Sequence, residues 1–202
     1  MHPGPAFAWT DEPAMLAFVG DRGFAHIFVA GPEGARVAHA PLLVTGDGQV
    51  QFHLARSNRA ASAIAGNRIL ASVTDLDAYH SANWYASDNQ VPTWHYQAVE
   101  IEGPAREIDH DALVAQLDAL SAKFEGIFQP DNPWTRAKMD PRRFEAFTRA
   151  IVGFELAPEA MRGTRKFNQH KSAADIEANL RGLTEAGRVD VADAIKRHWP
   201  AP

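Results

Sequence analysis

The chain has 202 residues, of which 46% are apolar and 22% are charged, and it contains no cysteine. This length and apolar content suit one globular domain and argue against disorder, and no apolar run approaches the roughly 20 residues of a membrane-spanning helix. The missing cysteines exclude disulfides, thiolate metal sites and cysteine nucleophiles, and the formal net charge of −5 argues against a general nucleic-acid binder, which needs a basic surface.

The N-terminus, MHPGPAFAWTDEP, lacks the basic start and apolar stretch of a signal peptide. We therefore expect a cytoplasmic protein that makes no membrane contact. We expect a single domain over residues 1–202, with a barrel core at about 10–157 and a C-terminal helical extension at about 158–202.

In chain order, the first half of the sequence predicts one helix and then a series of strands. Thr10 or Asp11 caps the helix. The expected strands are residues 24–29, 36–44, 49–54 and 69–74. Turns at Gly31–Gly34 and Gly46–Gly48 separate the first three strands, and a short helix at 59–65 precedes the fourth.

The second half of the sequence predicts more helix. A long strand is expected at 93–108, with a bulge or bend at Gly103–Pro104, and another strand at 151–156. The expected helices are residues 109–124, a helix that begins at Pro141, and a final pair at 172–182 and 189–199. Short strands joined by hairpins, with few helices between them, indicate an α+β fold built on a small antiparallel β-barrel with peripheral helices.

Several strong catalytic and binding motifs are missing. The sequence has no glycine-rich loop ending in Gly-Lys-Ser/Thr, no complete dinucleotide fingerprint and no Gly-x-Ser-x-Gly elbow. Nine histidines are present, but none has the spacing of a zinc site. His80, near Asp75 and Asp77, is interpreted as hydrogen-bonded in a turn, so we expect no metal site.

Residues 52–59 (FHLARSNR) lead from a strand into the start of a short helix. They bring free backbone N–H groups, the hydroxyl of Ser57 and the guanidinium groups of Arg56 and Arg59 close together. Helix N-termini attract anions, and arginine holds phosphate through paired hydrogen bonds. The alternative is an ordinary Ser/Asn helix cap with two solvated arginines.

The stretch 77–103 contains two tryptophans, all three tyrosines, two histidines and a proline. Trp84 and Trp94 fit either a buried core or a platform for a flat ligand. In the strand that contains Trp94, side chains alternate between two faces, with Thr93 and His95 on one face and Trp94 on the other. One polar and one aromatic face are typical of a strand that lines a ligand site.

These segments resemble the PaiB family of FMN-binding split-barrel proteins, which are described as negative transcriptional regulators. The resemblance spans nearly the whole chain. The matching segments are 52–58 (FHLARSN), 78–85 (AYHSANWY), 91–96 (VPTWHY), 151–155 (IVGFE) and 166–170 (KFNQH). The chain departs from the family at His95, where asparagine is usual, in 80–85, where the family has Ile-Ser-Pro-Ser-Trp-Tyr, and in 166–170, where it has Lys-Leu-Ser-Gln-Asn.

The resemblance implies an antiparallel split β-barrel and a homodimer that binds FMN at the subunit interface. It places the FMN phosphate near Arg56, Ser57 and Arg59, and the isoalloxazine ring near Thr93 and Trp94. The full set of expected FMN-binding residues is His53, Arg56, Ser57, Asn58, Arg59, Trp84, Thr93, Trp94 and His95.

The regulatory function is also implied by the resemblance alone. The last two predicted helices lack the basic, polar N-terminal turn of a recognition helix, so direct contact with nucleic acid has little support in the residues. One alternative is an FMN-dependent oxidoreductase, with or without NAD(P)H, on the same fold. Two others are a dimerisation or small-ligand module that has lost FMN, and a heme-binding variant of the barrel.

Overall fold

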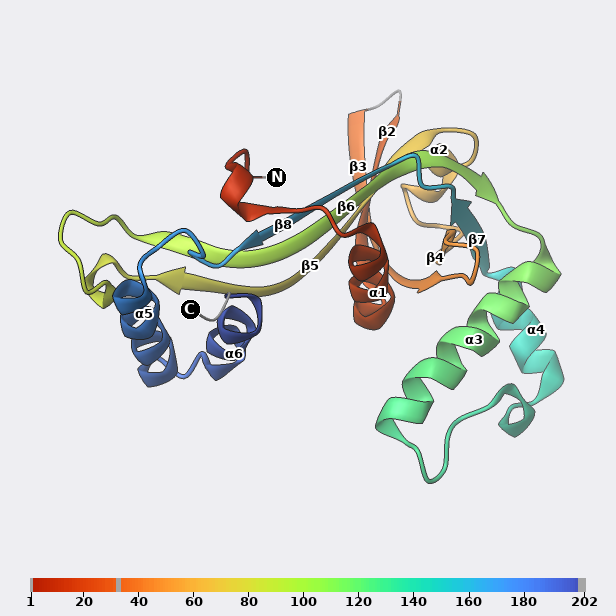
Figure 1. Ribbon diagram of the computed structural model, residues 1–202. Coiled ribbons are helices and arrows are strands. Elements are labelled where there is room, and N and C mark those ends of the chain that lie inside the picture. Colours follow the sequence, from red (N-terminus) through yellow and green to blue (C-terminus); the bar gives the residue numbers. More distant parts are fainter. Residues whose placement is uncertain (1, 32–33, 200–202) are drawn as a thin grey trace. The chain divides into compact units, whose positions relative to one another are not determined.

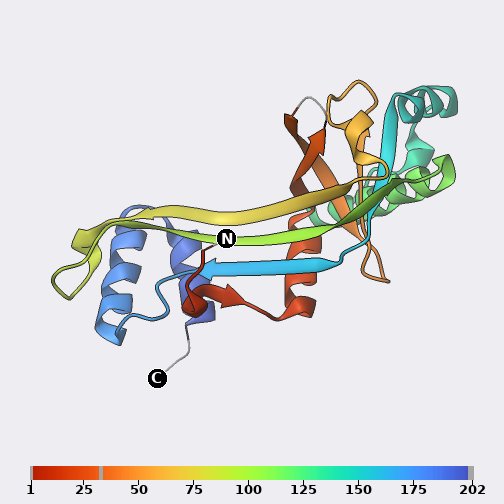
Figure 2. The ribbon, with the colours of Figure 1, turned by 90° about the horizontal axis from the view of Figure 1, so that it is seen from above.

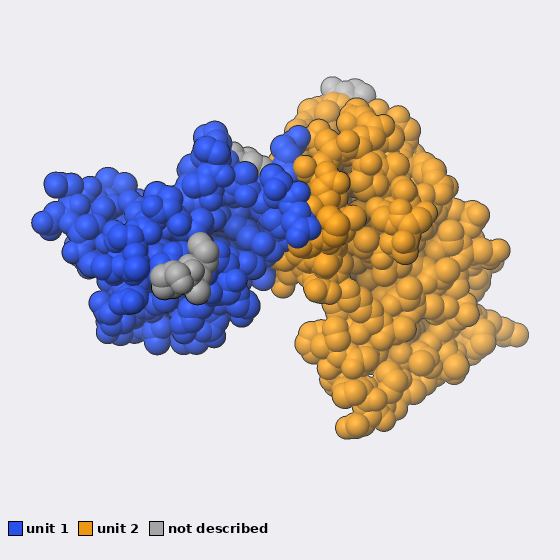
Figure 3. All heavy atoms as spheres, viewed as in Figure 1, with its two compact units in different colours: residues 1–11, 74–99, 162–202 blue, residues 12–73, 100–161 orange. Residues whose placement is uncertain are grey.

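The computed structural model describes residues 2–31 and 34–199, and it divides into two compact units (Figure 3). Unit 1 comprises residues 1–11, 74–99 and 162–202, and unit 2 comprises residues 12–73 and 100–161. Two long strands, β5 (Arg68–His80) and β6 (Thr93–Glu107), supply residues to both units. The predicted division into a core at about 10–157 and an extension at about 158–202 stays a prediction.

Unit 2 contains, among its described residues, an antiparallel barrel of six strands. The strands besides β5 and β6 are β2 (Phe24–Gly31), β3 (Gly34–Val44), β4 (Val50–Ala55) and β7 (Ile151–Leu156). They are hydrogen-bonded in the order β6-β5-β2-β3-β4-β7, and a further pairing of β6 with β7 closes the barrel. This α+β arrangement confirms the predicted antiparallel split β-barrel.

Alternation along the strands fills the barrel with apolar side chains. Every second residue of β2 and β4 is buried, and the residues between them are mostly more accessible. Phe52 of β4 and Phe154 of β7 lie directly opposite each other, and their rings stack with centroids 5.4 Å apart. Along each strand of a closed barrel, successive side chains point alternately into the barrel and out of it. The same alternation of apolar and polar residues in the sequence predicted these strands.

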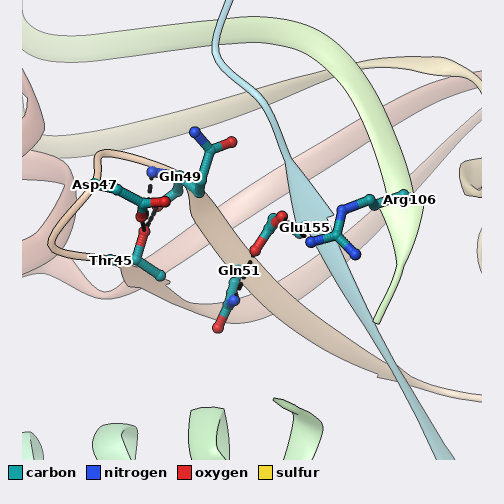
Figure 4. Close-up of polar contacts among 6 residues, drawn as sticks. All are labelled: Thr45, Asp47, Gln49, Gln51, Arg106 and Glu155. Atoms are coloured by element: carbon teal, nitrogen blue, oxygen red, sulfur yellow. Dashed lines mark hydrogen bonds and ion pairs between the residues drawn. The ribbon is translucent and has the colours of Figure 1, made fainter. Parts of the chain in front are cut away.

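Polar side chains fix two points on the outside of the barrel (Figure 4). In the turn between β3 and β4, the Thr45 hydroxyl donates to Asp47 Oδ1 (2.5 Å) and accepts from the Gln49 backbone N–H (3.0 Å). On the closing strands, Glu155 of β7 accepts from Gln51 of β4 (2.8 Å) and from Arg106 of β6 (2.5 Å). Glu155 therefore ties together the strands that close the barrel.

The helices of unit 2 pack on parts of the outside of the barrel (Figure 1). They are α1 (Glu12–Arg22), α2 (Ala61–Ile64), α3 (His110–Phe128) and α4 (Pro141–Arg149), with a 3₁₀ turn η3 (Arg136–Lys138) between α3 and α4. Asp109 caps α3 by accepting from the Ala112 backbone N–H at 2.8 Å. α3 packs on β3, β4 and β7, and a Cβ at Gly153 of β7 would come within 2.7 Å of the Ile108 side chain.

Gly103, in the middle of β6, allows a close backbone approach. A Cβ at this position would lie 1.8 Å from the Ala157 carbonyl oxygen, closer than any contact between these atoms permits. We predict that Gly103→Ala destabilises the protein by about 1–3 kcal/mol in urea unfolding. Gly126→Ala, at an exposed position of α3 where an added Cβ would have no atom within 4 Å, should instead raise the unfolding free energy by up to about 1 kcal/mol. Equal effects of the two substitutions would contradict this account.

Unit 1 has a core of its own. Its further elements are η1 (Pro5–Phe7), β1 (Ala8–Trp9), η2 (Ala82–Trp84), α5 (Ala173–Glu185), α6 (Val189–His198) and, from Arg162 onward, β8 (Ala160–Lys166). α5 and α6 lie against the parts of β5 and β6 that belong to unit 1, residues 74–80 and 93–99 (Figures 1 and 2). The core residues are Ala78, Phe167, Ile176, Leu183, Val191, Ala192, Ala194 and Ile195.

The buried side of β5 changes along the strand. Odd-numbered residues are buried at positions 69–73, whereas the even-numbered Ala78 and His80 are buried further on. Leu76 lies between these stretches with φ of +53°, a left-handed conformation that few non-glycine residues adopt. At Leu76 the buried positions therefore change from odd to even residue numbers. Because this change interrupts the alternating pattern, the sequence did not predict the second half of β5 as a strand.

Candidate functional site

The predicted phosphate segment forms an exposed turn between β4 and α2. Arg56 lies in this turn, donates from Nε to the Arg149 carbonyl (3.1 Å) and forms an ion pair with Glu107 at 3.7 Å. The Arg59 guanidinium and the Ser57 hydroxyl are exposed, and neither has a hydrogen-bond partner among the described residues. These groups remain available to an anion.

A third guanidinium group reaches the same turn from β3. Arg36 donates from Nη1 to the Arg59 carbonyl (2.5 Å) and to the Ser62 hydroxyl (3.4 Å). The sequence did not indicate Arg36, because it lies 23 residues from Arg59 and no local pattern connects them. Three arginines at one turn suit the charge and the hydrogen-bonding geometry of a phosphate.

The short helix after this turn differs from the prediction. A helix was expected at residues 59–65, but α2 has only four residues, and its first turn has no side-chain cap. Asn58 Oδ1 accepts from the Ala60 backbone N–H (2.9 Å), so the asparagine stabilises the turn that precedes α2. A helix of one turn has a small dipole, so the arginine side chains must supply the attraction for an anion.

His53 points to the outer side of β4, away from the barrel core. Its Nδ1 atom is buried and has no hydrogen-bond partner among the described residues, and the same is true of both polar side-chain atoms of Gln116 on α3. Burial lowers the pKa of His53, and the neighbouring Gln116 side chain acts in the opposite direction, although the two side chains do not meet the geometry of a hydrogen bond. A direct role for His53 in cofactor binding stays a prediction.

The aromatic strand β6 has the two faces that the sequence indicates. Trp94 is 54% exposed and makes an edge-to-face contact with Tyr79 of β5, which is 51% exposed, with ring centroids 5.9 Å apart. His95 and Gln97, on the opposite face, are buried. The two exposed rings form a T-shaped aromatic pair on the surface of unit 1.

His95 takes part in a buried chain of hydrogen bonds. Its Nδ1 donates to the Lys166 carbonyl (3.2 Å), which fixes Nε2 as an acceptor for Nδ1–H of His80 at 3.0 Å. The network then orients the Asn179 amide so that its nitrogen donates to His80 Nε2 at 3.1 Å. Both histidines are therefore neutral, with the proton on Nδ1, and Asn179 connects them to α5.

The surroundings of the two rings disfavour the charged form. Burial lowers the pKa of His80 to about 4, and burial together with the neighbouring His80 lowers the pKa of His95 to about 4. Both side chains are completely buried. An added proton on His95 Nε2 would face the Nδ1–H of His80, so protonation breaks the hydrogen-bond chain.

The connection between β5 and β6 is held by the C-terminal segment. Asp175, at the start of α5, accepts from the backbone N–H and the hydroxyl of Ser87, both at 2.9 Å. Lys171 donates to Gln90 (2.7 Å), and Lys166 donates to Thr93. The loop that leads to the exposed Trp94 is therefore fixed at several points.

Trp84 belongs to the core of unit 1. Trp84 packs against the buried apolar cluster to which α5 and α6 contribute. A Cβ at Gly182 of α5 would lie 2.4 Å from the indole ring. Gly182 thus leaves room for the indole. Contact of Trp84 with a flavin stays a prediction.

The expected cofactor residues fall into two groups. His53, Arg56, Ser57, Asn58 and Arg59 lie in unit 2, and Trp84, Thr93, Trp94 and His95 lie in unit 1. His80, expected to be hydrogen-bonded in a turn, is instead buried at the end of β5 and pairs with His95. The sequence did not indicate Asn179, because its contact with His80 joins residues far apart in the chain. No group of His, Cys, Asp and Glu side chains among the described residues is arranged to hold a metal ion.

The closed barrel gives the fold class of the protein. Solved structures with this fold include the FAD- and heme-binding protein from Mycobacterium smegmatis, 18% identical over 79% of this chain and 73% of that one, with a TM-score of 0.58. The flavocytochrome Anf3 from Azotobacter vinelandii is 16% identical over 82% of this chain and 72% of that one, with a TM-score of 0.60. The fold is therefore that of the flavin-binding split barrels.

Residues 1–160 match the family described as "Putative FMN-binding domain", and the chain belongs to this family. A relative from Bacillus subtilis (strain 168), Protease synthase and sporulation protein PAI 2, is 36% identical over 98 residues. That match spans 48% of this chain and about half the length of the relative, 46%. These findings confirm the resemblance to PaiB-like FMN-binding proteins.

FMN is the cofactor that this membership assigns, and the residues of the turn fit it. The fit is shown by the Arg59 guanidinium and the Ser57 hydroxyl, which are exposed and unengaged beside Arg36 and Arg56. Bound FMN supplies electron-transfer chemistry, and the protein supplies binding and orientation.

Within the described residues, no helix is long and apolar enough to cross a membrane.

Proposed function

We propose that the chain is a cytoplasmic, homodimeric FMN-binding protein with the flavin at the subunit interface. The phosphate would lie at the turn of Arg56, Ser57 and Arg59, and the flavin ring against aromatic residues of β6. The observation that carries this proposal is one exposed turn of a family barrel that contains Arg56 and Arg59 and that Arg36 contacts through the Arg59 carbonyl.

The dimer is tested by light scattering on the purified protein during size-exclusion chromatography. We expect a mass of twice the 22.1 kDa of the chain, both with and without added FMN. A single-chain mass under both conditions would contradict the proposed interface site.

We further propose that the protein acts as a negative transcriptional regulator of the PaiB type. The resemblance to the PaiB family, whose members are described as negative transcriptional regulators, supports this role, and the Bacillus subtilis PAI 2 protein is 36% identical over 98 residues. We expect a gel shift with DNA from the native upstream region at physiological salt, and no shift with a scrambled sequence of equal length. If no specific shift is seen, and the protein consumes NADPH only in the presence of FMN, the protein is an oxidoreductase instead.

A further inference from the structure

A cavity of about 850 Å³ lies between α3, the η3 segment and α4, entirely within unit 2. We propose that this cavity binds a small organic cation: an amine carried on a flat apolar body. None of the residues expected to bind FMN lines the cavity. The proposal is therefore independent of the flavin site.

The apolar part of the cavity wall is built from aromatic and aliphatic side chains of all three segments. Val114 comes from α3, Trp134 and Met139 come from the residues that flank η3, and Phe144 comes from α4. The Trp134 backbone N–H donates to Glu125 Oε2 of α3 at 2.8 Å, which fixes the position of this residue. A volume of this size and aromatic walls are typical of small-molecule sites.

The charged part of the wall is dominated by carboxylates. Asp111, Asp118 and Glu145 line the cavity, against a single lining guanidinium, that of Arg136. Arg136 is already held by Asp118 at 3.2 Å and lies over the Phe144 ring, 5.4 Å from its centroid. The cavity therefore has little attraction for an anion.

One carboxylate is left for a ligand. Glu145 accepts from Arg149 at 2.9 Å and lies 3.5 Å from His110 Nε2. Asp111 has no ion-pair or hydrogen-bond partner among the described residues. An ammonium group can pair with Asp111, while the flat body of the ligand stacks on the aromatic walls, which also attract cations.

The test compares three ligands of the same shape by isothermal titration calorimetry of the full chain. They are 2-phenylethylamine, 2-phenylethanol and 3-phenylpropanoate, which differ mainly in charge. We expect the amine to bind at least about tenfold more tightly than the alcohol, and the carboxylate to bind least tightly. Equal affinities for the three ligands, or no binding heat with any of them at millimolar concentration, would overturn the proposal.

Two variants locate the site. Asp111→Asn should weaken amine binding about tenfold and leave the affinity for the alcohol unchanged. Asp131→Asn, which removes the same charge from an exposed residue outside the cavity wall, is the matched control and should bind the amine like the unchanged protein. Far-ultraviolet circular dichroism and thermal unfolding confirm that both variants are folded. Equal loss in the two variants would show that the effect is only one of net charge, and would refute the site.

Discussion

The free energy of unfolding should fall by about 3 kcal/mol for each buried histidine as the pH is lowered from 7 to 4. His80 and His95 have a pKa of about 4 in the folded protein, against an ordinary value of 6.5 in the unfolded chain. Between pH 6.5 and pH 4 the unfolded chain binds more protons than the folded protein. The contribution of each histidine to the free energy of unfolding is therefore fully present above pH 6.5 and is lost as the pH falls toward 4. Urea unfolding at a series of pH values measures this loss.

A pair of variants separates this effect from the titration of other groups. His95→Asn removes one of the two buried imidazoles, so its stability should fall by about 3 kcal/mol less over the same pH range. His39→Asn, at an exposed histidine of β3, is the matched control for the loss of an imidazole at the surface. If His95→Asn kept the full pH dependence, the buried histidine pair would not be its source.

The affinity for FMN should fall about a hundredfold or more when Arg56 and Arg59 are both replaced by alanine. Each charge-assisted hydrogen bond to the phosphate contributes about 1.5–3 kcal/mol, and the two losses together give this factor. The binding of riboflavin, which has the flavin ring without the phosphate, should not change. Fluorescence titration of each flavin gives the two affinities.

The matched control for this experiment removes two positive charges elsewhere. Arg142 and Arg197 are exposed and lie outside the predicted site, so their replacement by alanine should leave the affinity for FMN nearly unchanged. If the double variant binds FMN and riboflavin with equally reduced affinity, these arginines contact the flavin ring instead. If its affinity for FMN is unchanged, the phosphate does not bind at this turn.

The sequence predicts most of the barrel because local signals mark it. Strands β2, β3 and β4 alternate in apolar character and are separated by glycine turns, so their positions can be read from neighbouring residues. β8 carries Arg162, Arg165 and Lys166 and has few apolar residues, so no strand pattern marks it. Its pairing with β1, with Thr164 opposite Ala8, joins residues from opposite ends of the chain.

The same distinction applies to the candidate site. The turn of Arg56 and Arg59 is a contiguous segment, and its potential for phosphate binding can be inferred from the sequence. The contacts of Arg36 with that turn, and of Asn179 with His80, depend on the folded chain. No spacing in the sequence indicates such pairs.

Retention of FMN by the purified protein tests the central claim most directly. The protein is mixed with FMN, dialysed extensively, and scanned for the flavin absorbance bands. The account predicts retained bands that correspond to about one FMN per chain. A colourless protein after dialysis would show that the barrel is present without a working flavin site.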